Sequence, residues 1–106
     1  MTAYTTSGRA THEVLSTKGL LLYTITTSGV FTRNGQTCSA TSASGTFQPA
    51  SSAAWSSTPT ITRGSISQTK AYARTSGVAR SGALTKSYNL TLICDISGNL
   101  TSTFSE

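Results

Sequence analysis

Apolar and polar residues alternate most clearly near the C-terminal end of the sequence. Every second residue from position 88 to position 96 is apolar: Tyr88, Leu90, Leu92, Cys94 and Ile96. A period of two is typical of a β-strand with one buried face. Ser97-Gly98-Asn99 has the composition of a turn, and Leu100, Ser102 and Phe104 alternate again. The last 20 residues therefore predict a β-hairpin.

A similar pattern occupies the first third of the chain. Residues 20–27 predict one strand, Ser28-Gly29 a turn, and residues 30–33 a returning strand. Asn34-Gly35 is the dipeptide of a tight hairpin turn and leads toward Cys38. Three strands in a meander are expected here.

The segment 39–59 is small, polar and uncharged, and its bulky side chains are Phe47 and Trp55. This composition predicts a long Ser/Ala-rich loop at about 39–59. Loops longer than about 15 residues are uncommon inside compact domains and tend to be functional. Phe47 and Trp55 are therefore predicted as apolar contacts to a partner.

Residues 60–62 and 66–72 predict one or two further strands, with Gly64 between them as a turn or bulge. No segment supports a substantial helix. The elements together predict an all-β fold, a small β-sandwich or compressed barrel of about six to eight short antiparallel strands. At 106 residues and 11.0 kDa, we expect a single domain over 1–106 with a thin core.

Ser and Thr make up 39 of the 106 residues, a composition that raises disorder as an alternative. Only 10% of the residues are charged, and the apolar residues cluster, which favours a folded chain. No apolar run approaches the length of a membrane span, and no signal peptide is expected. We expect no contact with a membrane, and a location in a virion, or in the cytoplasm before assembly.

The net charge of +5 is concentrated in residues 63–86, which carry five cations and no acid. Lys70, Tyr72 and Arg74 would lie on one face of a strand, where cations and an aromatic ring can hold phosphates and a base. The alternative is a solvated edge strand. The predicted anion contacts are Arg63, Lys70, Tyr72, Arg74, Arg80 and Lys86. Nucleic acid or an acidic protein surface would be the anionic partner.

Two cysteines, Cys38 and Cys94, allow one disulfide or none. The order Cys38, Trp55, Cys94 resembles the succession in immunoglobulin domains, but position 92 is Leu where such domains have a tyrosine. The resemblance agrees with a sandwich. Scattered residues between positions 3 and 29 reappear between 71 and 98 at an offset of 68 or 69, for example Ser7-Gly8 as Ser76-Gly77, which is compatible with an internal duplication.

Catalytic chemistry has few candidates, because the chain has one His, one Asp, two Glu and two Cys. His12 and Glu13 adjoin many Ser residues, but no nucleophile-elbow motif is present. The spacing of His12 and the cysteines does not suit zinc. We expect no enzymatic activity, no cofactor and no metal.

A non-enzymatic structural or assembly subunit fits most of these features. Small size, Ser/Thr-rich strands and scarce charge resemble the composition of phage and viral structural proteins, such as coat, decoration or tail proteins. Subunit contacts would then offset the thin core. We expect self-association or binding to neighbouring structural proteins. The alternative is a carbohydrate- or surface-binding β module that uses exposed aromatic rings, and a further one is a non-specific nucleic-acid binder.

Overall fold

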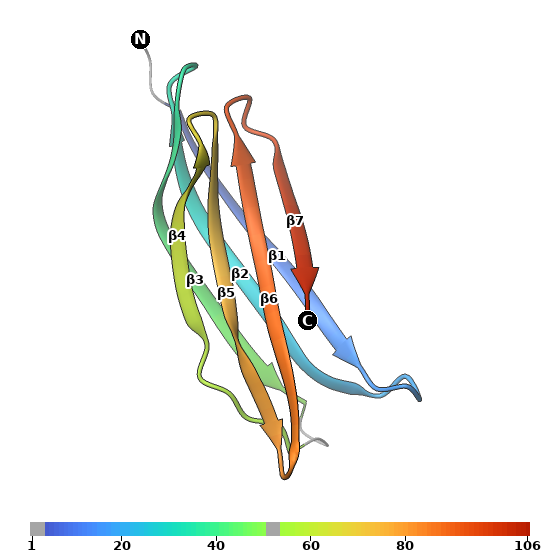
Figure 1. The fold of residues 1–106 in the computed structure, drawn as a ribbon. Coiled ribbons are helices and arrows are strands. Elements are labelled where there is room, and N and C mark those ends of the chain that lie inside the picture. Colours follow the sequence, from blue (N-terminus) through green and yellow to red (C-terminus); the bar gives the residue numbers. More distant parts are fainter. Residues whose placement is uncertain (1–3, 51–53) are drawn as a thin grey trace.

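The computed structural model describes residues 4–50 and 54–106, and these form an elongated all-β sandwich of seven strands without a helix (Figure 1). One sheet contains, in spatial order, β1 (Tyr4–Leu15), β2 (Leu21–Arg33) and β3 (Cys38–Pro49). The other contains β4 (Thr60–Ser67), β5 (Lys70–Ser81), β6 (Leu84–Asp95) and β7 (Leu100–Ser105). Both sheets are antiparallel meanders. The predicted all-β sandwich is confirmed, although β2 reaches 13 residues and is not short.

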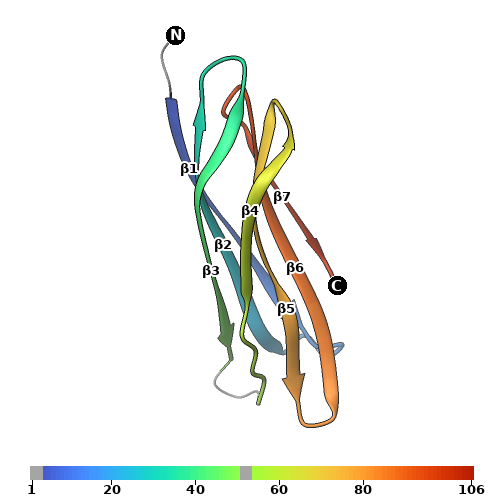
Figure 2. The ribbon, with the colours of Figure 1, turned by 60° about the vertical axis from the view of Figure 1, so that its left-hand side comes forward.

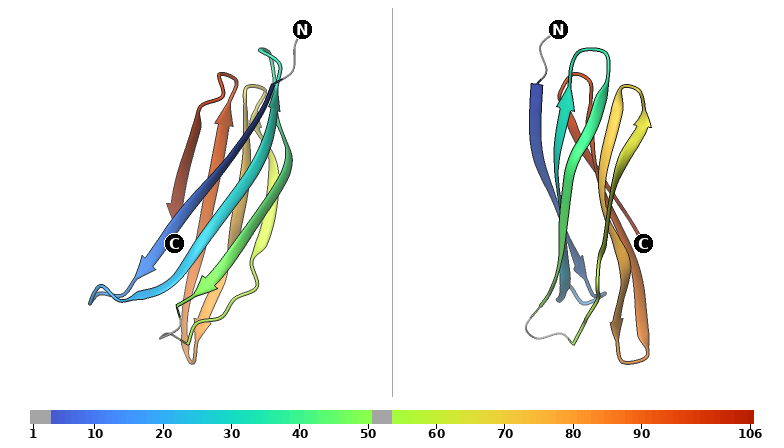
Figure 3. Two further views of the ribbon diagram at one scale, coloured as in Figure 1. Left: turned by 180° about the vertical axis from the view of Figure 1, so that it is seen from behind. Right: turned by 90° about the vertical axis from the view of Figure 1, so that its left-hand side faces the viewer.

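The two sheets pack face to face, as the right-hand view of Figure 3 shows. The core side chains come mainly from alternate positions of β2 and β6. They are Tyr23, Ile25 and Phe31 on β2, and Tyr88, Leu90, Leu92 and Cys94 on β6. The opposing residues of β5 are small: Ala71, Ala73 and Ala79 are fully buried. Large side chains therefore fit against small ones across the interface.

The predicted turn at Ser28-Gly29 is wrong, because β2 runs through it without a break. Gly29 has no positive φ and lies on the buried face. A Cβ there would come within 3.0 Å of both the Phe31 ring and Ala73. This glycine makes room for close packing between the sheets and does not turn the chain.

The predicted loop over 39–59 is corrected by the structure, because its first half is strand β3. Most inward residues of β3 are small, with Phe47 as the exception, and Ala40 is buried in the core. After Pro49, the described residues Ala50 and 54–59 belong to no named strand, and Ser56 forms an isolated bridge to Arg80. Residues 51–53 of the predicted loop lie outside the described part of the chain. Gly64 is not a turn, because β4 continues through it to Ser67, and the irregular pairing with β5 lies between Ser65 and Ser67. The turn falls at residues 68–69, so the strand predicted over 66–72 is divided between β4 and β5.

The β3 and β4 side of the sandwich is held by polar contacts between the sheets, and Figure 2 shows the two strands side by side. The Cys38 amide donates to the Gln68 carbonyl at 3.0 Å. Arg63 Nη1 donates to the Ala40 carbonyl at 2.8 Å. These contacts use polar groups at the edge of β3 that would otherwise face solvent.

The opposite side of the sandwich, between β1 and β7, is held by side chains alone. His12 and Phe104 stack with ring centroids 3.7 Å apart. Leu100 packs over Gly8, where a Cβ would overlap its Cδ1. In the described part of the chain, no backbone hydrogen bond joins β1 to β7. This side therefore leaves main-chain groups of both strands without a strand partner.

Candidate functional site

Four of the six predicted anion contacts lie on one strand face. Lys70, Tyr72, Arg74 and Arg80 occupy even positions of β5, while the odd positions Ala71, Ala73, Thr75 and Ala79 are buried. The predicted alternation of Lys70, Tyr72 and Arg74 along one face is thus present. We call this outer surface of the four-stranded sheet the basic face.

Arg74 is the centre of the basic face. Its guanidinium carbon lies 4.8 Å from the centroid of the Tyr72 ring, a cation–π contact. Arg74 Nε donates to Thr91 Oγ1 at 3.0 Å, and the Thr91 hydroxyl donates to Asn89 Oδ1 at 3.1 Å. Thr91 is only 6% exposed although it lies on this outer face. The chain of contacts fixes Arg74 while its terminal nitrogens stay available as donors.

Tyr72 lies over the neighbouring strand at Gly64, its pairing partner on β4. A Cβ at position 64 would be 3.1 Å from both Cε1 and the hydroxyl oxygen of Tyr72. The absence of a side chain at Gly64 therefore lets the tyrosine ring lie flat on the sheet. The sequence pattern around Gly64 suggested a turn and hid this packing role.

Arg63 and Lys86 do not join the basic face. The Arg63 guanidinium donates a hydrogen bond to the Ala40 carbonyl of the other sheet. Lys86 lies opposite the buried Ala79, so it is on the inner side of the four-stranded sheet and not on its outer surface. Its Nζ lies 4.0 Å from Glu106 Oε2. Of the six residues predicted to contact an anion, four therefore share the basic face, and Arg63 and Lys86 make separate contacts elsewhere.

Phe47 and Trp55, the predicted partner contacts, pack inside the sandwich. Their ring centroids lie 4.9 and 5.7 Å from that of Tyr23. Trp55 is 9% exposed. Its remaining surface lines a hollow of about 470 Å³ at one end of the molecule. Leu15, Leu22 and Leu84 also line this hollow, together with Ser and Thr side chains and Lys86.

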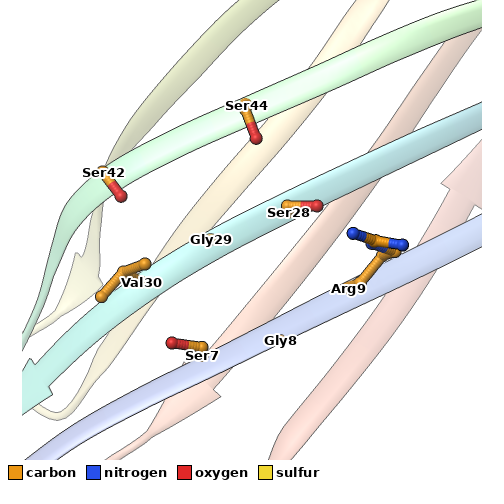
Figure 4. A pocket seen from close by; sticks show the side chains of 8 residues that line it. All are labelled: Ser7, Gly8, Arg9, Ser28, Gly29, Val30, Ser42 and Ser44. Atoms are coloured by element: carbon orange, nitrogen blue, oxygen red, sulfur yellow. The ribbon is translucent and has the colours of Figure 1, made fainter.

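A second shallow hollow lies on the outer face of the three-stranded sheet (Figure 4). Serine side chains of all three strands line it, together with Arg9 and Val30. Ser28 pairs with Arg9 on one side and with Ser44 on the other. Sequence reasoning missed this surface, because its residues are polar positions from three strands. Their alternation with buried residues was the available signal, and it was obscured in β3 by small side chains.

β1 carries two isolated charges of opposite sign on this outer face, Arg9 and Glu13. Both are exposed, and Thr11 lies between them. Within residues 4–50 and 54–106, neither charge takes part in an ion pair. β1 is also the border strand of its sheet (Figure 3, left).

The remaining titratable groups are dispersed or buried. His12 is covered on one side by Phe104. Cys38 and Cys94 are free, buried thiols from the two sheets, and Cys38 Sγ lies 3.5 Å from the Cys94 carbonyl. Burial, and secondarily the neighbouring Cys38, raises the pKa of Cys94 to about 11. The described ranges hold no cluster of three His, Cys, Asp or Glu residues suited to a metal.

The described residues also contain no helix able to cross a membrane. The geometry thus offers four surfaces: the basic face, the hollow beside Trp55, the serine-lined hollow and the open border of β1. Comparison with known proteins finds no matching family model, no matching curated protein and no matching solved structure.

Proposed function

We propose that the protein is a non-enzymatic structural subunit that associates with further copies through the open β1 border of its three-stranded sheet. One observation carries the proposal. Among residues 4–50 and 54–106, the 12-residue border strand β1 has a strand partner on one side alone, which is β2, and it bears no proline. Such edges readily accept another strand through main-chain hydrogen bonds.

The contrast between the two sides of the sandwich supports this choice of surface. The border at β3 is occupied by the Arg63 side chain and by the Gln68 carbonyl. No described residue makes an equivalent contact at the border of β1, where the contacts to β7 are made on the buried side by His12 and Gly8. An added strand would therefore meet free main-chain groups at β1.

The small core gives association a stabilising role. Many core positions are alanine, so the buried apolar area per residue is modest. Binding that favours only the folded state adds to stability by mass action. A coat, decoration or tail component of a virion is the setting that we propose, in keeping with the composition.

Association is tested by measuring the molar mass with light scattering coupled to size-exclusion chromatography, over a wide range of protein concentration. We expect the mass to rise from 11.0 kDa toward multiples of it. Hydrogen exchange should show β1 amides becoming protected over the same range, while β4 amides do not change. A mass of 11.0 kDa at every concentration, with constant exchange in β1, would contradict the proposal.

The basic face supports a second function, binding of an anionic ligand such as nucleic acid. The ordered contacts of Arg74 with Tyr72 and Thr91 favour it, because they present donors beside an aromatic ring. Tyr23 and Tyr88 are buried, which removes them as sugar-binding platforms. Single-stranded oligonucleotides should bind with strong salt dependence. Arg74→Gln should weaken binding more than Lys18→Gln does, a change at an exposed cation in the turn between β1 and β2. Equal effects would count against a site at Arg74.

A further inference from the structure

The residues on the outer face of β1 restrict which strand can pair with its open border, and in which register. Its outer-face residues are Thr5, Ser7, Arg9, Thr11 and Glu13, all exposed. When two sheets join edge to edge into a continuous sheet, outer-face residues must lie opposite outer-face residues. In an antiparallel pair of two β1 strands, odd positions therefore face odd positions.

The charged residues favour one of the registers that place odd positions opposite odd positions. Arg9 and Glu13 are the only charged residues of β1 on this face. If Arg9 faced Arg9 of a second copy, or Glu13 faced Glu13, like charges would lie directly opposite and destabilise the pair. If Thr11 faces Thr11 of the second copy, each Arg9 faces a Glu13, and two ion pairs form at once.

We infer that β1 binds β1 of a second copy of this chain, antiparallel and with Thr11 opposite Thr11, so that Arg9 of each copy pairs with Glu13 of the other. The inference rests on the proposed function and specifies its partner and register. A twofold axis through the Thr11 pair relates the copies, as in most homodimers. The two three-stranded sheets become one sheet of six strands.

The length of regular β1 agrees with this register. Gly8 would face Val14 of the second copy, so all residues from 8 to 14 are paired. The register of β1 with β2 shifts between Val14 and Leu15, which ends the regular strand at that point. On the buried side, Ala10 would face His12 of the second copy, and a small residue there leaves the His12–Phe104 stack undisturbed.

Cysteine cross-linking tests the register directly. In Thr11→Cys the two new thiols lie opposite each other, at the short Cβ separation of cross-strand pairs. Oxidised glutathione as the oxidant would convert them to one intermolecular disulfide, releasing two molecules of reduced glutathione. The matched control is Thr5→Cys, also exposed on the same face of β1. Its two copies would lie about 40 Å apart along the strands.

We expect a covalent dimer of Thr11→Cys on a non-reducing gel and none of Thr5→Cys. The native Cys38 and Cys94 are buried and common to both proteins, so they do not distinguish the two. If wild-type protein associates but Thr11→Cys stays monomeric, or Thr5→Cys cross-links equally, the register is wrong while association through an edge stands. A wild-type mass of 11.0 kDa at all concentrations overturns both.

Charge reversal provides an independent test without new thiols. Arg9→Glu and Glu13→Arg should each weaken dimerisation by about fivefold or more, because each places like charges opposite one another twice. The double variant Arg9→Glu/Glu13→Arg restores opposite charges and should restore the affinity. Arg80→Glu on the other sheet is the control for net charge. Failure of the double variant to recover, with both single variants folded, overturns the pairing.

Discussion

The hydroxyl oxygens of Thr27 and Thr75 lie 2.8 Å apart in the middle of the interface between the two sheets. Both residues are fully buried. The Thr27 hydroxyl can donate to Thr75 Oγ1 or to the Leu90 carbonyl at 2.9 Å, and the Thr75 hydroxyl donates to the Thr26 carbonyl at 3.3 Å. A small polar network thus lies within the core, and each of its hydroxyl groups has a hydrogen-bond partner.

Replacing Thr27 by Val should lower the free energy of unfolding by about 1–2 kcal/mol, because Val keeps the shape but removes the hydroxyl. The double variant Thr27→Val/Thr75→Val should lose less unfolding free energy than the two single variants added together. Each single change leaves the other hydroxyl without this partner, and the second substitution removes that unpaired hydroxyl. Urea unfolding measures all three. Thr46→Val, at an exposed position of β3, is the control and should change stability little. Strict additivity would show that the two hydroxyls are not coupled.

Gly45 should not tolerate a side chain. It pairs with Thr27, and a Cβ at position 45 would overlap Thr75 Oγ1 and approach the Thr26 carbonyl to 3.0 Å. We expect Gly45→Ala to lower stability by about 1–3 kcal/mol through overpacking. Ser44→Ala, at the adjacent exposed position, should be nearly neutral. A stable Gly45→Ala protein with an unchanged near-ultraviolet spectrum would contradict the close approach of β3 and β5.

Stability should fall in alkaline solution because of Cys94. Its pKa is raised from 9.0 to about 11, chiefly by burial. An unfolded chain would release this proton from about pH 9, whereas the folded chain retains it until about pH 11. The contribution is therefore complete below pH 9 and is lost as the pH rises to 11. Urea midpoints between pH 8 and pH 10 check this, and Cys94→Ala should show a flatter profile than wild type.

The hydrogen bond from Arg63 to the Ala40 carbonyl should stabilise the β3 side of the sandwich and slow amide exchange there. Arg63→Met keeps the apolar stem but removes the hydrogen bond to Ala40, which should cost about 1 kcal/mol. The Cys38 amide, bonded to Gln68 beside it, should then exchange faster with deuterium. Arg80→Met, exposed on the basic face, serves as the control. Unchanged exchange at Cys38 would show that Arg63 does not stabilise this side of the sandwich.

The elements with bulky alternating residues were predictable from sequence. β6 and the Ser97-Gly98-Asn99 turn follow the expected pattern, as does the Asn34-Gly35 turn. Positive φ angles occur at Gly35 and Gly98, the glycines within these two turns. A period of two also predicts that Lys70, Tyr72 and Arg74 share one face of a strand, and they do so on β5.

The errors arose where residues are small. Between Ser39 and Thr46, β3 has Ala or Gly inside and Ser or Thr outside, a pattern that carries almost no contrast in hydrophobicity. Gly29 resembles a turn residue, but its role depends on Phe31 and on Ala73 of the other sheet. The burial of Trp55 depends on Tyr23, more than 30 positions away. Such contacts are tertiary, and no local pattern encodes them.

The meander order of both sheets has a consequence for how the chain folds. Every paired strand is joined to its neighbour by a short reversal, so each sheet can assemble by successive hairpin closures, which take microseconds. Docking of the two sheets is different, because it must bring together residues such as Thr27 and Thr75, separated by 48 positions. The rate-limiting barrier is thus expected at docking, and a chain cut between the two sheets would retain every strand pairing within each half.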